Sequence, residues 1–263
     1  MLGLGVAVFA PLAWAGDALP GAARAADVVI LGEVHDNPAH HAVQADWVAA
    51  LAPRAVVFEM LTEAQAGADM PGLRADQAAL DAALGWSDGG WDAFDMYYPV
   101  LAASAARFYG AAVPRAQLRA AYGGDVIALF GAGAADYGLT DALPDAQLAA
   151  RLDLQYEAHC EAMPRDSLGG MVEIQRLRDA TLARAVLRAL EEQGPPVAVV
   201  TGNGHARRDW GVPSYLARVA PGVSVFVLGQ SEDGRDPEGG FDLVLDAPAV
   251  DRPDPCAVFR KSK

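Results

Sequence analysis

Four short apolar runs constrain the fold of this chain more than any other feature of its sequence. They are rich in β-branched residues and are too short to be helices of ordinary length. Because they lack the polar alternation of a half-exposed strand, they predict strands that are buried on both faces of a parallel sheet. The runs are Val28–Leu31, Ala55–Phe58, Val197–Val200 and Val223–Leu228.

Helical patterns separate these predicted strands. Asn37 followed by Pro38 is typical of a helix N-cap and first helical residue, and apolar residues recur at four-residue intervals after them. A second long helix is predicted from about Met171 to Glu192, ahead of Gly194 and two prolines. Strands that alternate with helices over short connections indicate an α/β fold, with a mainly parallel sheet flanked by helices on both faces.

The segment from about Gly67 to Pro164 has a different pattern. It is rich in alanine, and its spacing predicts helices rather than buried strands. We expect a helical insertion lobe beside the carboxyl ends of the strands, within a single domain of residues 16–263. Most aromatic residues of this segment are expected to pack the lobe onto the sheet: Trp86, Trp91, Tyr97, Tyr98, Phe108, Tyr109, Tyr122 and Tyr137.

Charge and the first residues limit the partners and the compartment. The formal net charge of -14 disfavours nucleic acid and anionic membrane surfaces as partners. Residues 1–15 form a short apolar run ending in Ala-Trp-Ala, which predicts a signal peptide cleaved before Gly16 and a protein exported to a bacterial periplasm. The run is shorter than the roughly 20 apolar residues of a spanning helix, so no integral membrane segment is expected.

Polar residues follow each predicted strand at its carboxyl end. Glu33 and His35 follow the first strand, Glu59 the second, His205 the third and Gln230 the fourth. Ligands bind at this edge in open parallel sheets. Carboxylates and imidazoles together suit general acid-base catalysis or a divalent metal, with His35 and His205 as the metal ligands. The alternative is that Glu33 caps a helix and His35 bonds a loop.

Two further histidines, His40 and His41, lie in the first turn of the helix after Asn37. His40 falls on the apolar face of that helix and is predicted to be a partly buried packing residue. His41 is one position away from that face and is predicted to be solvated.

Arg178 interrupts an apolar stripe of the second long helix, as does Gln175. A buried arginine requires an acidic partner or a bound anion. Glu33 or Glu59 would supply the acid, and the resulting pair would be either structural or part of the site.

At these residues the chain resembles the ChaN-like haem-binding family, which belongs with Tiki proteases, TraB-type proteins and erythromycin esterases. The resemblance rests on LGEVHDNPAHH, FEM, QRLRDA and TGNGHARRDWGVP and covers Asp27 to about Leu228. It implies an exported bacterial protein that binds haem between two subunits of a homodimer, in contact with haem-uptake machinery. A tyrosine on the haem iron is also implied, and the segment FDMYYPV places it at Tyr97.

Two other details come from the sequence and the resemblance together. An exported protein with two cysteines favours a disulfide between Cys160 and Cys256, and the family-like HCEAMP and DPC segments agree. The alternative is one buried thiol and one thiol in the tail. The family-like NLPR reads AVPR here, so Ala112 replaces a polar residue of the pocket.

Three functions compete on this evidence. The first is an exported haem-binding protein in iron uptake or handling, with Tyr97, His35 and His205 binding the haem. The second is a metal-dependent hydrolase, an esterase or protease, with Glu33, His35, Glu59, Arg178 and His205 as catalytic residues. The third is an interaction module in which the strand-end residues only stabilise the fold.

Overall fold

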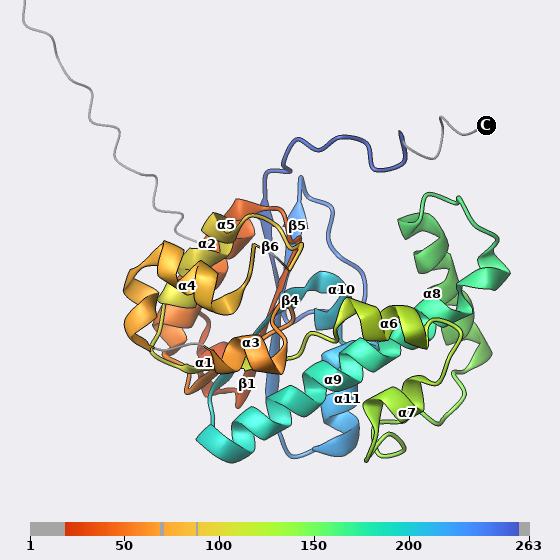
Figure 1. The fold of residues 1–263 in the computed structure, drawn as a ribbon, viewed down its shortest axis with the longest axis horizontal. Helices are drawn as coiled ribbons and strands as arrows, with labels where there is room; N and C mark the ends of the chain where they lie inside the picture. Colours follow the sequence, from red (N-terminus) through yellow and green to blue (C-terminus); the bar gives the residue numbers. More distant parts are fainter. Residues whose placement is uncertain (1–18, 69–70, 88, 258–263) are drawn as a thin grey trace, which may run out of the picture.

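Six parallel strands form one sheet in the order β3-β2-β4-β1-β5-β6 in the computed structural model, which describes residues 19–68, 71–87 and 89–257 (Figure 1). Val28 pairs with Val197 on one side and Val225 on the other, so β1 lies between β4 and β5. The predicted parallel α/β fold is confirmed. The strands are β1 (Val28–Glu33), β2 (Ala55–Phe58), β3 (Arg107–Gly110), β4 (Val197–Gly202), β5 (Val225–Glu232) and β6 (Leu243–Ala247).

Alternate residues of each central strand enter two separate hydrophobic layers. Val29 and Leu31 point to the layer under α1 (Gly21–Ala25) and α2 (Pro38–Leu51). Val28 and Ile30 point to the layer under the long helix α9 (Gly169–Gln193) and α11 (Val212–Val219). Because both faces are covered, the central strands need apolar residues at every position, which explains the four runs.

The two predicted helices are confirmed, with ends set by local chemistry. The Asn37 side chain accepts a hydrogen bond from the Ala39 backbone N–H at 3.0 Å, and Pro38 is the first residue of α2. Helix α9 ends before Gly194, whose φ of 76° is accessible to glycine at little cost.

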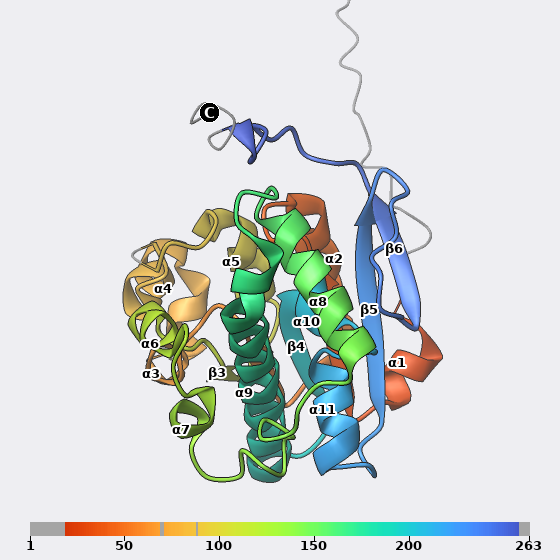
Figure 2. The ribbon, with the colours of Figure 1, turned by 90° about the vertical axis from the view of Figure 1, so that its right-hand side faces the viewer.

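The segment from about Gly67 to Pro164 is not purely helical as predicted, because the strand β3 lies within it and divides its helices into two groups. Phe108 and Tyr109, expected in helices, lie in this edge strand and face opposite hydrophobic layers. The helices before β3 pack on the layer of α2, and α6 and α7 after it pack on the layer of α9 (Figure 2). These elements are α3 (Glu63–Gly67), η1 (Pro71–Ala75), α4 (Gln77–Leu84), α5 (Phe94–Ala102), α6 (Arg115–Ala121), α7 (Val126–Phe130), α8 (Asp145–Ala158) and η2 (Arg165–Leu168).

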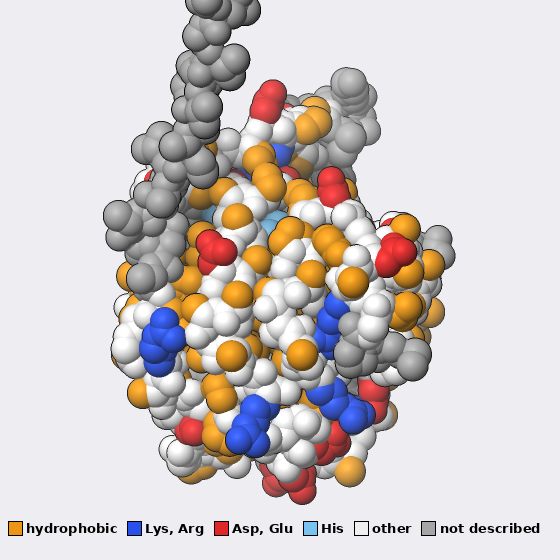
Figure 3. All heavy atoms as spheres, turned by 90° about the vertical axis from the view of Figure 1, so that its left-hand side faces the viewer, with side chains coloured by type: hydrophobic (Ala, Val, Ile, Leu, Met, Phe, Trp, Pro, Cys, Tyr) orange, Lys and Arg blue, Asp and Glu red, His pale blue; other side chains and the backbone are white. Residues whose placement is uncertain are grey.

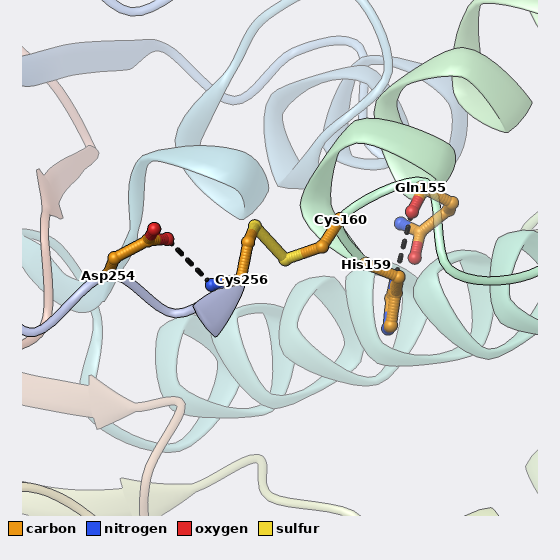
Figure 4. The surroundings of a disulfide bond; sticks show 5 residues. All are labelled: Gln155, His159, Cys160, Asp254 and Cys256. Atoms are coloured by element: carbon orange, nitrogen blue, oxygen red, sulfur yellow. Dashed lines mark hydrogen bonds between the residues drawn. A yellow bond between two sulfur atoms is a disulfide. The ribbon is translucent and has the colours of Figure 1, made fainter. Parts of the chain in front are cut away.

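The segment after β6 crosses above the carboxyl ends of the strands to reach α8 (Figures 1 and 2). Cys256 forms a disulfide with Cys160, just beyond the end of α8, with the two Cα atoms 5.4 Å apart (Figure 4). Arg252 forms ion pairs with Asp36 and Glu232 at 2.6 Å. The predicted disulfide is confirmed, and it fixes the tail to the helical region.

Membrane and nucleic-acid partners were disfavoured by the sequence. In the described part of the chain no helix is both long and apolar enough to cross a membrane. On the face viewed in Figure 3, the Lys and Arg side chains of described residues lie in separate groups rather than as one basic surface. The predicted signal peptide lies outside the described residues.

A candidate site at the carboxyl ends of the strands

The predicted strand-end residues converge on one connected network. Glu33 comes from the end of β1 and Glu59 directly follows β2. His205 lies in α10 (Asn203–Ala206), the short helix that follows β4, and Arg178 reaches the same place from α9. His35 lies between the two glutamates, with its Nδ1 atom 2.7 Å from Glu33 and its Nε2 atom 3.8 Å from Glu59.

Glu33 is a buried carboxylate whose oxygens accept hydrogen bonds from several elements. Oε1 accepts from the Tyr97 hydroxyl and from His35 Nδ1, each at 2.7 Å. Oε2 accepts from the Gln44 amide at 2.6 Å. Burial alone would raise the pKa of Glu33, but the bonds from His35 and His41 outweigh it and hold the pKa well below its usual range.

His41 belongs to this network, and the prediction that it is solvated is wrong. It is 1% exposed, and its Nδ1 atom lies 3.4 Å from Glu33 Oε2. Its Nε2 atom donates to the His35 backbone carbonyl at 2.8 Å. His40 is also 1% exposed and accepts a hydrogen bond from the Val34 N–H at 3.0 Å, so both neighbouring histidines turn inward.

Glu59 is held by fixed donors and a permanent cation. Its Oε2 atom accepts from the Thr201 hydroxyl at 2.6 Å and from the Gly202 backbone N–H at 2.8 Å. Arg178 forms an ion pair with Oε1, which resolves the choice between Glu33 and Glu59 as its partner. Burial opposes ionisation, but His205 and Arg178 outweigh it and lower the pKa of Glu59 to about 2.

His205 is oriented by Asp179, a residue that the sequence analysis did not select. His205 Nδ1 donates to Asp179 Oδ1 at 2.6 Å, and its Nε2 atom lies 3.5 Å from Glu59. The Gln175 amide lies 3.1 Å from the same ring. Asp179 is four residues after Gln175 on α9, so the two side chains lie on the same face of the helix, and this spacing could have identified Asp179 as a neighbour of the site.

His35 is the most accessible ionisable group of the cluster. Its side chain is 31% exposed, and its ring lies 5.2 Å from the ring of Trp91. Burial would lower the pKa of His35, but the Glu33 hydrogen bond and the Glu59 charge raise it to about 9. A Cβ atom on Gly202 would lie 2.8 Å from His35 Nε2, so a larger residue at this position would displace the His35 ring from its present place.

Tyr97 lies in the same network but inside it. The residue is 0% exposed, and its ring packs 4.1 Å from His41 and 4.6 Å from Trp86. Burial and the adjacent Glu33 carboxylate raise the pKa of the Tyr97 hydroxyl, so the phenol form is favoured.

A cavity of about 320 Å³ opens beside this network. Glu59, Thr62, Gln65 and Arg178 supply its polar wall, and Arg115 adds a second cation. Ala112 lines it, where the family resemblance led us to expect a polar residue. The apolar lining includes Met60, Trp91, Val113, Pro114 and Leu118.

Gln230 reaches the edge as predicted but has a structural role. Its amide donates to the Gly32 carbonyl at 2.7 Å, joining β5 to β1.

As for metals, the described residues contain no group of three or more His, Cys, Asp or Glu side chains arranged to hold an ion.

A family model and one solved structure agree with this architecture. A family model described as haem-binding uptake, Tiki superfamily, ChaN matches residues 19–216. The solved structure of cofacial haem binding to ChaN of Campylobacter jejuni matches with a TM-score of 0.64 and 21% identity, covering 81% of this chain and 84% of that one. The type III effector HopBA1 matches with a TM-score of 0.48 and 12% identity, covering 85% and 88%. Curated protein sequences give no significant match.

Proposed function

Because the chain belongs to the ChaN family of haem-binding uptake proteins in the Tiki superfamily, we propose that it binds haem as cargo at the carboxyl ends of the strands. The observation that carries this location is His35. Its imidazole is partly exposed and lies against Trp91 and Glu59, which line the cavity, and its Nδ1 atom is already bonded to a buried carboxylate. No other histidine of the cluster combines an oriented ring with access from solvent.

The donor set fits haem. A carboxylate accepts hydrogen bonds only, so the bond to Glu33 keeps a proton on His35 Nδ1. Nε2 would be the nitrogen for iron once it gives up the proton that a pKa of about 9 retains there at neutral pH. Metal-binding histidines usually have such a carboxylate behind them. Met60, Trp91 and Leu118 offer apolar contact to a porphyrin, and Arg115 and Arg178 offer cations to its propionates. Bound haem supplies an iron that takes axial ligands and exchanges electrons.

The role of Tyr97 as the iron ligand remains a prediction. Its hydroxyl would have to leave Glu33, to which it is bonded at 2.7 Å, and to lose a proton that the Glu33 charge helps to retain. We therefore assign Tyr97 the role of holding Glu33, and through Glu33 the ring of His35. His205 stays a second prediction, since its Nδ1 atom is bonded to Asp179 and its side chain is 4% exposed.

A homodimer, export and haem uptake complete the proposal. The cavity volume of about 320 Å³ is at the small end of ligand sites, so one chain covers only part of a haem and a second subunit would cover the rest. The Cys160–Cys256 disulfide supports an oxidising compartment such as the periplasm. An exported haem carrier would hand its cargo to uptake machinery.

Titration with hemin tests the proposed location. Wild-type protein is expected to give a saturable shift of the Soret band. Leu118→Glu puts a carboxylate into the apolar lining and should weaken binding at least tenfold, whereas Leu154→Glu, at a 39% exposed position on α8, should not. No saturable shift in the wild type, or equal affinities for the two variants, would contradict the proposal.

A metal-dependent hydrolase is the second candidate, and the Asp179–His205 pair is the observation that favours it. An imidazole held by a carboxylate suits proton transfer, with Glu33 or Glu59 activating water and Arg178 stabilising an oxyanion. Elemental analysis of protein purified without chelator tests this candidate. A stoichiometric divalent metal that is lost in His205→Ala would favour hydrolysis, and its absence would remove the metal-dependent route.

A further inference from the structure

A second cavity, of about 440 Å³, is lined by residues of α8, α9 and α11. In the ribbon, α8 and α11 lie on the side of α9 away from α6 (Figure 2). This cavity shares no lining residue with the strand-end cavity. Adjacent positions of α9 serve the two cavities, because Arg178 lines the first and Arg176 the second. The second cavity is therefore a separate place on the molecule.

Arg151 from α8 lines this cavity with most of its hydrogen-bonding capacity unused. The residue is 5% exposed, and its Nε and Nη1 atoms are buried without a hydrogen-bond partner in the described structure. Its contacts are a 3.4 Å hydrogen bond from Nη2 to the Trp210 carbonyl and a position 5.1 Å from the Trp210 ring. Burial lowers the pKa of Arg151, because a charged guanidinium without a full set of partners is less stable inside the protein than in water.

The other charged groups of the cavity are already paired. Arg218 forms an ion pair with Asp141 at 2.8 Å, and Asp209 with Arg207 at 2.7 Å. Arg176 forms an ion pair with Glu173 at 2.9 Å and donates to the Gly138 carbonyl at 2.6 Å. Among the residues that the structure describes, no carboxylate forms an ion pair with Arg151, although the charge of the buried Asp179 acts on it from farther away, in the direction that raises its pKa.

The lining as a whole favours an anion despite the net charge of -14. Three arginines and two aspartates face the cavity, which leaves one positive charge in excess. A guanidinium has the planar donor geometry that matches a carboxylate. Apolar and aromatic side chains form the rest of the wall: Tyr137, Leu143, Pro144 and Tyr215.

We propose that this cavity binds a small monocarboxylate with an apolar or aromatic body, whose carboxylate pairs with Arg151. A single negative charge neutralises the one unpaired cation, and the ring or chain of the ligand lies against Tyr137 and Leu143. This site is independent of haem binding, because its residues belong to a different cavity.

Titration of the full haem-free protein with benzoate, followed by calorimetry, tests the proposal. Wild-type protein should bind with saturable, millimolar or tighter affinity, and Arg151→Gln should weaken binding at least tenfold. Arg119→Gln removes the same charge from an exposed position on α6 and should leave the affinity unchanged. Inorganic phosphate, tested alone, should bind at least tenfold more weakly than benzoate.

A second measurement does not depend on the folding of a variant. Wild-type crystals soaked in 4-bromobenzoate should show an anomalous bromine peak in the cavity lined by Arg151 and Tyr137. Absence of saturable benzoate binding, tighter binding of phosphate, equal affinity in Arg151→Gln, or a bromine peak only elsewhere would each overturn the proposal.

Discussion

The two buried glutamates of the strand-end site keep their charge by different means. Glu59 is bonded to the permanent cation of Arg178 and to the Gly202 backbone N–H. Glu33 has no guanidinium and depends on neutral donors and on the histidines His35 and His41. Glu59 therefore keeps one partner whose charge does not change with pH, in addition to His205, whereas every charged partner of Glu33 is a histidine that can titrate.

This difference separates a half that contains a permanent cation from a half whose only cations are histidines. The Glu59 half has Arg178 and the Asp179–His205 pair, and its two carboxylates are 3% and 0% exposed. The Glu33 half ends in His35, whose side chain is 31% exposed. Only the second half offers solvent a group whose protonation can change on binding.

Glu59→Gln should have the largest effect on stability. The substitution keeps the shape of the side chain but leaves Arg178 near the buried site without its anion, and breaking a buried ion pair typically costs about 3 kcal/mol or more. Urea denaturation should show a loss of about 3 kcal/mol in the free energy of unfolding. A loss below that of the equivalent Glu33 variant would refute the fixed-charge description of this half.

Glu33→Gln should cost less, about 1 to 2 kcal/mol. Its partners are a tyrosine, a glutamine and histidines, and the histidines can lose their protons when the carboxylate is gone. The remaining cost is that of imperfectly satisfied buried hydrogen bonds. The same urea experiment measures it, and a loss equal to that of Glu59→Gln would remove the distinction between the halves.

The pH dependence of stability should show a smaller effect, confined to the Glu33 half. The pKa of His35 rises from 6.5 to about 9 on folding, so its contribution is fully present below pH 6.5 and is lost as the pH rises through about 9. Partial exposure of His35 keeps this contribution modest. Melting temperatures of haem-free protein should therefore fall across this window.

His35→Gln provides the control for that pH series. The variant should lose most of the decline between pH 6.5 and 9, and His205→Gln should retain it. A decline of the same size in both variants would mean that another group titrates.

The sequence predicted the centre of the fold better than its edges. The four β-branched runs identified β1, β2, β4 and β5, because central strands buried on both faces are apolar at every position. The edge strands β3 and β6 were missed. Arg107 is exposed in β3 and Asp246 is exposed in β6, so neither strand reads as a continuous apolar run.

The positions of polar residues after the strands also identified most residues of the candidate site. Parallel strands bring their carboxyl ends to one edge, and this rule correctly predicted that Glu33, Glu59 and His205 lie together. His41 and Asp179 were missed because their roles depend on how α2 and α9 rotate against the sheet. The apolar periodicity fixes that rotation only to within a residue, which is enough to turn His41 inward.

The most direct test of the central claim is a hemin titration that compares His35→Gln with His205→Gln. Both substitutions remove one imidazole from the strand ends, but only His35 is accessible from solvent. Loss of the proposed iron ligand should weaken haem binding by about tenfold or more and shift the Soret band in His35→Gln, whereas His205→Gln should keep the wild-type spectrum. A wild-type spectrum and affinity in His35→Gln, or a spectrum altered only in His205→Gln, would contradict the assignment of His35 as the residue that binds haem.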